Sequence, residues 1–182
     1  MASEALVAAL RETLPDVQLE HVPSIDLHTT VYVSREELPV VARALHEAGG
    51  LSFAFLAELT AVDFWPREPR FEVVYLLVSV ERALRLRLKV RLHDGDARVP
   101  TLSGIWPAAN WLEREVWDLF GITFVGHPDP RRLLMPEDWE GFPLRKDYPV
   151  QINERVRTAS PMQMTEEEFR ANVQKDRLTR GR

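Results

Sequence analysis

The densest group of charged and aromatic side chains lies in EREVWDLFGITFVGHP, residues 113–128. Its acids Glu113, Glu115 and Asp118 stand a short way before His127. Carboxylates and imidazoles bind divalent metals and act as general acids and bases. The stretch therefore raises three hypotheses: a metal site, an acid/base catalytic pair, or a surface that binds another protein.

The spacing of these residues argues against most kinds of enzyme. No pair of histidines has the i, i+4 spacing of HExxH, and the sequence contains no GxGxxG, P-loop or GxSxG pattern. Metal hydrolysis, nucleotide binding and serine hydrolysis thus lack their usual geometry. A stand-alone enzyme stays open as the alternative, with acid/base or metal-binding groups from Glu113, Glu115, His127 and Asp129.

A helix over residues 107–120 is predicted to carry the motif. At about 100° per residue, one arc of this helix is apolar and has Glu113 inside it; the apolar residues are Ala109, Leu112, Val116, Trp117, Leu119 and Phe120. The opposite arc holds Trp111, Arg114, Glu115 and Asp118 and is expected to face outward. On that arc, Arg114 and Asp118 have the spacing of an i, i+4 ion pair.

Glu113 needs a compensating partner, because an unpaired buried carboxylate costs several kcal/mol. Arg131, Arg132 and Arg145 are the nearest cations in the following segment. We therefore expect Glu113 to fasten that segment to the helix through an ion pair. The alternative is a general acid with a raised pKa.

The segment after Gly121, residues 122–161, is rich in proline and is predicted to be an extended arm without regular structure. Ordering ~25 of its residues costs about 25 kcal/mol, which takes about 1,000 Å² of buried apolar surface to offset. Its apolar side chains are too many for a small domain to cover: Leu133, Leu134, Met135, Trp139, Phe142, Leu144 and Tyr148. The arm is therefore expected to dock on another chain, or to be disordered alone. A last helix is predicted at 165–177.

The region before the motif predicts an α+β domain of order α-β-β-α-β-β-β, in which helices cover one side of a mixed sheet. Helical periodicity marks residues 3–14, and a capping box at Ser34 and Glu37 starts a second helix. A hairpin is expected near 17–33, and two buried central strands at 51–64 and 71–80. LRLRLKVRL (84–92) alternates strictly, so its four cations form either a solvated face or a contact with an acidic partner.

Composition narrows the classes further. The net charge of −5 disfavours nucleic acid as a partner. With no cysteine, the chain can provide no disulfide and no Cys-ligated cluster. No apolar run is long enough to span a bilayer, and a soluble cytosolic protein is expected.

LEREVWDLFGITFVGHPDPRRLL (112–134) and EGFPLRKDYP (140–149) resemble the signature region of the 30 kDa or C-type component of respiratory complex I, the proton-pumping NADH:quinone oxidoreductase. The resemblance implies a protein without a cofactor in the peripheral arm, at the cytoplasmic side of the cell inner membrane and reaching the membrane only through the complex. Its partners would be the large quinone-site subunit and iron–sulfur subunits, with the clusters and FMN in those partner chains. The equivalent component of an energy-converting hydrogenase, or of another donor-specific complex, is similar and remains an alternative.

The resemblance also assigns residues, and none of them is catalytic, cofactor-binding or metal-binding. The signature and structural residues are Glu113, Arg114, Glu115, Trp117, Asp118, Phe120, Gly121, His127, Pro128, Arg131 and Arg132, and the partner-docking residues are Trp111, Leu144, Arg145, Lys146, Asp147, Tyr148 and Pro149. Phe142 departs from the pattern, which often has histidine there, so no titratable role is carried over. The expected organisation is a core domain (1–121), a docking arm (122–161) and a C-terminal helix or tail (162–182).

Overall fold

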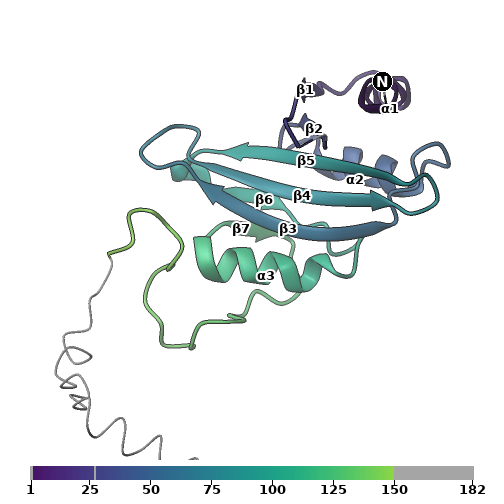
Figure 1. Ribbon diagram of the computed structural model, residues 1–182. Helices are drawn as coiled ribbons and strands as arrows, with labels where there is room; N and C mark the ends of the chain where they lie inside the picture. Colours follow the sequence, from purple (N-terminus) through teal and green to yellow (C-terminus); the bar gives the residue numbers. More distant parts are fainter. Residues whose placement is uncertain (1, 27, 150–182) are drawn as a thin grey trace, which may run out of the picture. The chain divides into compact units, whose positions relative to one another are not determined.

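The computed structural model describes residues 2–26 and 28–149 of the chain (Figure 1). Met1–Tyr148 form one compact unit. Its helices are α1 (Ala2–Thr13), α2 (Leu38–Glu47) and α3 (Ala109–Phe120), with a 3₁₀ turn η1 (Asp94–Asp96). Its strands are β1 (Glu20–Val22), β2 (Thr29–Tyr32), β3 (Phe55–Asp63), β4 (Phe71–Ser79), β5 (Leu84–Leu92), β6 (Arg98–Pro100) and β7 (Thr123–Val125). The predicted helix at 165–177 lies outside the described residues.

The strands form a mixed sheet, as predicted. Its five strands run in the order β1-β2-β5-β4-β3, with β2 parallel to β5 and the other neighbours antiparallel. The predicted order α-β-β-α-β-β-β is confirmed through β5, and the 17–33 hairpin forms from β1 and β2. The small strands β6 and β7 pair in parallel beside the main sheet.

The expectation of two central strands is wrong for β3. This strand lies at the edge of the sheet, whereas β4 lies between β3 and β5. Phe55 and Val62 on β3 remain 54% and 38% exposed. Apolar residues on both faces predicted burial, but the parallel pairing of β5 with β2 puts β5 in the middle and leaves β3 with one neighbour.

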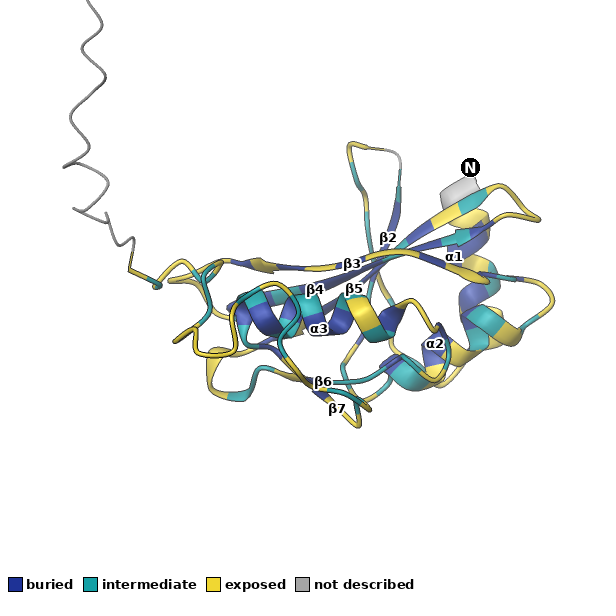
Figure 2. Cartoon of the chain, turned by 90° about the horizontal axis from the view of Figure 1, so that it is seen from below, coloured by how far each residue is buried: buried dark blue, intermediate teal, exposed yellow. Residues whose placement is uncertain are grey.

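One face of the sheet packs on the core. Leu86, Leu88 and Val90 of β5 are buried there, as the alternation predicted. Side chains of all three helices join this core, and α3 packs against β3. Figure 2 shows α3 lying across the strands on that face. The opposite face carries the cations of β5.

The start of α2 contains the predicted capping box in altered form. The hydroxyl of Ser34 accepts a hydrogen bond from the Glu37 backbone N–H (3.2 Å) and donates one to the Glu37 carboxylate (2.8 Å). The box thus closes the turn that leads into the helix, because the Glu37 side chain bonds the hydroxyl of Ser34 rather than its backbone. Leu38, Val41, Ala42 and Leu45 are buried, as their spacing predicted.

Candidate functional site

Helix α3 carries the motif, and Gly121 ends it. Gly121 has φ 75°, and its N–H donates to the Trp117 carbonyl (2.9 Å), which is the usual left-handed end of a helix. A Cβ atom on Gly121 would lie 2.5 Å from the Phe142 ring. Glycine is therefore required at this position both for the backbone conformation and for the close approach of the arm.

Glu113 points into the domain and has no exposed surface. Its carboxylate accepts hydrogen bonds from the Thr101 hydroxyl and from the Leu102 backbone N–H (2.6 Å). Burial raises the pKa of Glu113 to about 7, although both hydrogen bonds act in the opposite direction. Glu113 thus holds the loop that follows β6 against α3.

The predicted ion pair between Glu113 and an arm arginine is wrong. Arg131 pairs with Asp129, Arg132 with Asp118, and Arg145 with Asp94. The arm runs along the other side of α3, so no arm cation within the described residues pairs with Glu113. The nearest titratable group is His127, whose Nε2 lies 3.9 Å from a Glu113 oxygen.

His127 is held in one orientation by two backbone groups. Its Nδ1 accepts a hydrogen bond from the Asp129 N–H, and its Nε2 lies 3.0 Å from the Asn110 carbonyl. Since a carbonyl accepts only, Nε2 carries the proton in this arrangement. The side chains of His127 and Glu113 are only 4% and 0% exposed, so no substrate can reach both of them. This burial removes the basis of the acid/base enzyme hypothesis.

Arg114 and Asp118 were expected to face outward as a pair, and both are instead buried beneath the arm. The guanidinium of Arg114 donates to the carbonyls of Arg131 and Arg132 (3.0 Å each). A second arm residue, Asp129, forms an ion pair with it at 3.4 Å. The i, i+4 pair does not form because the arm supplies better-placed partners to each side chain.

Asp118 is the carboxylate that fastens the arm. One of its oxygens accepts three consecutive backbone N–H groups, those of Leu133, Leu134 and Met135 (2.7–3.0 Å). The other pairs with Arg132 at 2.7 Å. Burial opposes ionisation of Asp118, but these four donors outweigh it and hold its pKa below the ordinary value.

A second fastening lies around Arg70, which the sequence reading did not single out. Its side chain is 2% exposed and forms paired hydrogen bonds with Asp63 (2.9 and 3.0 Å) and with Asp147 of the arm (2.6 and 3.0 Å). Asp94 contacts it at 3.0 Å and also pairs with Arg145. Burial opposes ionisation of Asp63, yet Arg70 and two backbone N–H groups lower the Asp63 pKa to about 2.

The position of Asp63 and Arg70 at the two ends of the β3–β4 hairpin was the available signal for this site. Two charges of opposite sign ending adjacent antiparallel strands lie side by side. Asp147 and Arg145, predicted to dock on a partner, here make these contacts within the chain.

The described part of the arm therefore lies on its own domain as far as Tyr148. The entropy argument considered apolar burial alone, whereas the arm is held by the charged groups of Asp118 and Arg70 and by a Leu144 N–H bond to the Leu119 carbonyl. Its apolar side chains are poorly covered: Leu134 is 59% exposed and Leu144 48%. The remainder of the predicted arm, 150–161, lies outside the described residues.

The other residues of the motif are divided between the core and the surface. Phe120 is buried, Trp117 is half-buried with the Arg132 guanidinium 5.7 Å from its ring, and Glu115 is half-buried. Pro128 is exposed. Trp111 is 59% exposed, and the Arg114 guanidinium lies 5.1 Å from its ring.

Two further searches concern only residues 2–26 and 28–149. Within these, no group of three or more His, Asp or Glu side chains has the geometry of a metal site. None of the helices in that part of the chain is long and apolar enough to cross a membrane.

Comparison with known proteins decides the family. The family described as "Respiratory-chain NADH dehydrogenase, 30 Kd subunit" matches residues 31–154. The chain belongs to this family. It is the 30 kDa, or C-type, component of an NADH-quinone oxidoreductase, as the resemblance of its motif implied.

Relatives named as the C-type component of NADH-quinone oxidoreductase match most of their own length. The one from Roseiflexus sp. (strain RS-1) is 49% identical over 145 residues, or 80% of this chain and 83% of that one. The one from Geobacter sulfurreducens is 50% identical over 127 residues, covering 69% and 77%. A relative from Acidiphilium cryptum, named as a joint C/D component, is 40% identical over 93% of this chain but only 29% of its own length.

Two solved structures are similar. A trypsin-resistant fragment of Nqo5 has a TM-score of 0.56 with 33% identity, covering 71% of this chain and 99% of that one. A chain of the membrane-bound sulfane sulfur reductase, an archaeal respiratory membrane complex, has a TM-score of 0.72 with 28% identity, covering 91% and 96%.

Proposed function

We propose that this protein works as a cofactor-free structural part of the peripheral arm of the oxidoreductase. The observation that carries the proposal is a family match over residues 31–154 in a chain without cysteine, the residue that ligates most iron–sulfur clusters. The iron–sulfur clusters and FMN then reside in partner chains, and this protein keeps those chains in register during electron transfer from NADH to quinone.

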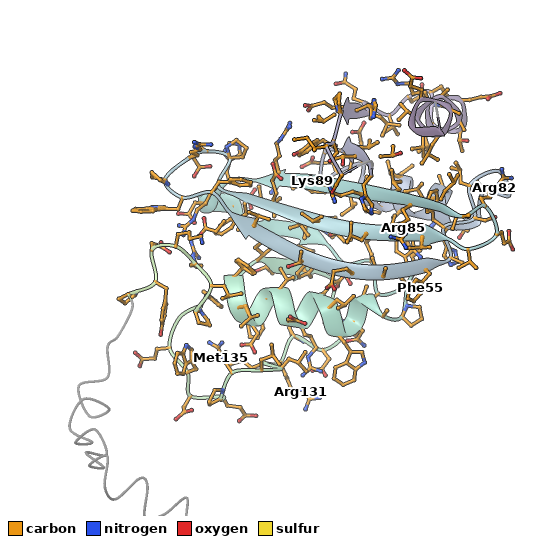
Figure 3. All side chains as sticks on the ribbon, in the orientation of Figure 1. Phe55, Arg82, Arg85, Lys89, Arg131 and Met135 are labelled. Carbon is orange, nitrogen blue, oxygen red and sulfur yellow. The ribbon has the colours of Figure 1, made fainter. Side chains whose placement is uncertain are left out.

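The docking surface lies along α3 and the arm. We define it by the exposed residues Trp111, Leu134, Trp139, Leu144 and Lys146. The stick view in Figure 3 shows this region beneath α3, where Arg131 and Met135 are labelled. Because Asp118 and Arg70 already hold the arm, binding a partner costs little further ordering. The predicted docking residues Arg145, Asp147, Tyr148 and Pro149 border this surface, and Tyr148 stacks on Trp139.

The large quinone-site subunit is the proposed principal partner, together with iron–sulfur subunits. The relative from Acidiphilium cryptum is named with both letters, C/D, and the present chain matches only 29% of it. A single polypeptide that bears both letters supports a direct contact between the C-type and D-type components. Attachment to the membrane then comes only through the complex, at the cytoplasmic side of the inner membrane.

The electron donor is a property of the partners in this proposal. The sulfane sulfur reductase chain shares the fold at 28% identity, so related proteins serve more than one membrane complex. The match to relatives named for NADH favours NADH for this chain over the hydrogenase-like alternative.

The proposal is tested with a tagged chain isolated from detergent-solubilised membranes. We expect it to co-purify with an NADH-oxidising assembly, and Trp111→Ala with Leu144→Ala to reduce that recovery severalfold. Val40→Ala is the matched control, since Val40 on α2 is exposed to 56% against 59% for Trp111. Recovery only as a free monomer would contradict membership of the assembly. Equal loss with the control would contradict the docking surface alone.

A further inference from the structure

The uncovered face of the sheet has one cation that the chain itself does not neutralise. Of the four cations of β5, Arg87 pairs with Asp26, Lys89 with Glu72 at 2.8 Å, and Arg91 with Glu20 at 2.7 Å. For Arg85, the described residues offer no ion pair and no side-chain hydrogen bond. The row is therefore a solvated face of internal ion pairs except at this end.

Arg85 lies beside an apolar groove. Strand register aligns Phe55, Val78 and Arg85 across β3, β4 and β5. The groove has a volume of about 460 Å³, and we name it the Phe55 groove. Its lining residues are His28, Phe55, Ala57, Leu76, Leu77, Val78, Val80, Arg85 and Leu86, so that its lining contains no carboxylate.

The apolar part of the groove is open to solvent. Phe55 is 54% exposed and Val80 76%. In Figure 3, Phe55 and Arg85 lie at the same end of the sheet, near Arg82 of the β4–β5 turn. The side chain of Arg82 donates to the Gly49 carbonyl (3.1 Å) and keeps its positive charge uncompensated by any carboxylate in the described region. Arg131 and Met135 are labelled beneath α3, on the other side of the sheet.

We propose that the Phe55 groove is a second docking site, which receives an acidic and apolar segment of a neighbouring subunit. An apolar side chain of that segment fills the groove against Phe55 and Val80, and an Asp or Glu within a few residues of it pairs with Arg85. The argument is complementarity: the groove provides apolar surface with a cation at its rim, and lacks a carboxylate of its own. An arginine beside an apolar pocket is a frequent anchor of protein interfaces.

The edge position of β3 supports an extended segment as the occupant. In the described part of the chain, β3 pairs only with β4, and its other side has no strand partner. Open strand edges in native proteins are usually charged, covered or paired with another chain. Over its nine residues, β3 has only Glu58 and Asp63 as charged side chains, and Asp63 is buried by Arg70. A neighbouring chain that crosses this edge reaches both Phe55 and Arg85.

This inference rests on the proposed function, because the occupant belongs to the same oxidoreductase. It adds a site on the opposite side of the sheet from the docking surface of α3 and the arm. The protein thus joins neighbours on two sides.

Photocrosslinking in the intact complex tests the proposal. Val80→p-benzoylphenylalanine in the full chain, irradiated within the purified assembly, is expected to crosslink to a peptide of another subunit. We expect that peptide to have an Asp or Glu within three residues of the crosslinked apolar side chain. A crosslink to residues 150–182 of the same chain, a crosslink between two copies, a crosslinked peptide without a carboxylate, or no crosslink in an intact complex would each overturn the proposal.

Charge reversal provides the second measurement. Arg85→Glu is expected to lower recovery of the protein in the complex about tenfold, and reversal of the crosslinked carboxylate to Arg is expected to restore it. Arg43→Glu is the control, an exposed arginine of α2 outside the groove. Equal effects of the two substitutions would overturn the proposal. If the unmodified chain were absent from any NADH-oxidising assembly, the proposed function itself would fail, an outcome distinct from an intact complex in which Arg85→Glu assembles normally.

Discussion

Helix α3 buries one carboxylate on each of two sides, and the two are opposite in their electrostatics. Glu113 faces the core and has two hydrogen-bond donors, and its pKa is raised to about 7. Asp118 faces the arm and has three backbone N–H donors and a guanidinium, and its pKa is lowered. Both side chains have no exposed surface. The difference shows that the number and charge of the donors, not burial, decide whether a buried carboxylate is ionised.

The two carboxylates also differ in what they hold. Glu113 joins α3 to the loop after β6, within the domain. Asp118 joins α3 to the arm, and through it positions the exposed Leu134. Loss of Glu113 is thus expected to affect the core, and loss of Asp118 the docking surface.

The largest expected effect is that of Asp118→Asn. The amide side chain cannot accept all four donors, and the charge of Arg132 loses its partner, so unfolding free energy at pH 7 should fall by roughly 4 kcal/mol. Denaturant unfolding measures this change, and amide exchange should accelerate at Leu133, Leu134 and Met135. Asp138→Asn is the control at an exposed arm position, and an equally large effect there would end the distinction.

Glu113 should give the opposite dependence on pH. Its folded-state pKa of about 7 exceeds the ordinary 4.5, so the folded chain binds an extra proton between these values. Stability contributed by this group is therefore complete below pH 4.5 and falls by about 3 kcal/mol as the pH rises through 7. For Asp118, whose pKa is lowered, the contribution is complete above the ordinary pKa and is lost as the pH falls.

Glu113→Gln tests that dependence. We expect the variant to lose this decline with pH and to be more stable than the parent chain at pH 8, because an amide stays neutral while accepting from Leu102. An ion pair with an arm arginine would instead predict that the variant is weaker at pH 8. Urea titrations at pH 5 and pH 8 separate the two outcomes, with Glu115→Gln as a half-buried control on the same helix.

Removing one donor from Asp118 should matter less than removing the carboxylate. In Arg132→Met the three backbone N–H groups remain, and the expected loss is about 1–2 kcal/mol with the Asp118 pKa moving toward its ordinary value. NMR titration of the carboxyl carbon measures that pKa. An unchanged pKa would mean that the backbone donors alone set it.

The smallest expected effect comes from Thr101→Val. It removes the hydroxyl donor from Glu113, leaving the Leu102 N–H, and should raise the Glu113 pKa further with a stability change below about 1 kcal/mol at pH 5. The same carboxyl titration measures the shift. A fall in the pKa would contradict the assignment of this hydroxyl as a donor to Glu113.

Local sequence patterns predicted much of the fold. The stripe of α2, the alternation of β5 and the position of Gly121 each correspond to one element, because they reflect the period of a helix, the period of a strand and the left-handed turn that glycine permits. The edge position of β3 was missed, because its apolar residues identify a strand but not its neighbours.

The candidate site was predicted in its residues but not in its pairings. Helical geometry correctly put Glu113 toward the core and Trp111 on the exposed surface. It assigned Arg114 and Asp118 to solvent because the covering arm is remote from the helix arc. Arg70 was overlooked, since its three carboxylate partners come from positions 63, 94 and 147.

The sequence by itself determined the family, the helix that carries the motif, and the absence of cysteine ligands, since these depend on residue identity and on near neighbours along the chain. Only the tertiary structure decided which carboxylate holds the arm, which strand forms the edge, and which cation of β5 has no ion pair within the described residues. Those properties depend on distances between residues far apart in the chain, and the free energy of a buried charge depends on such distances.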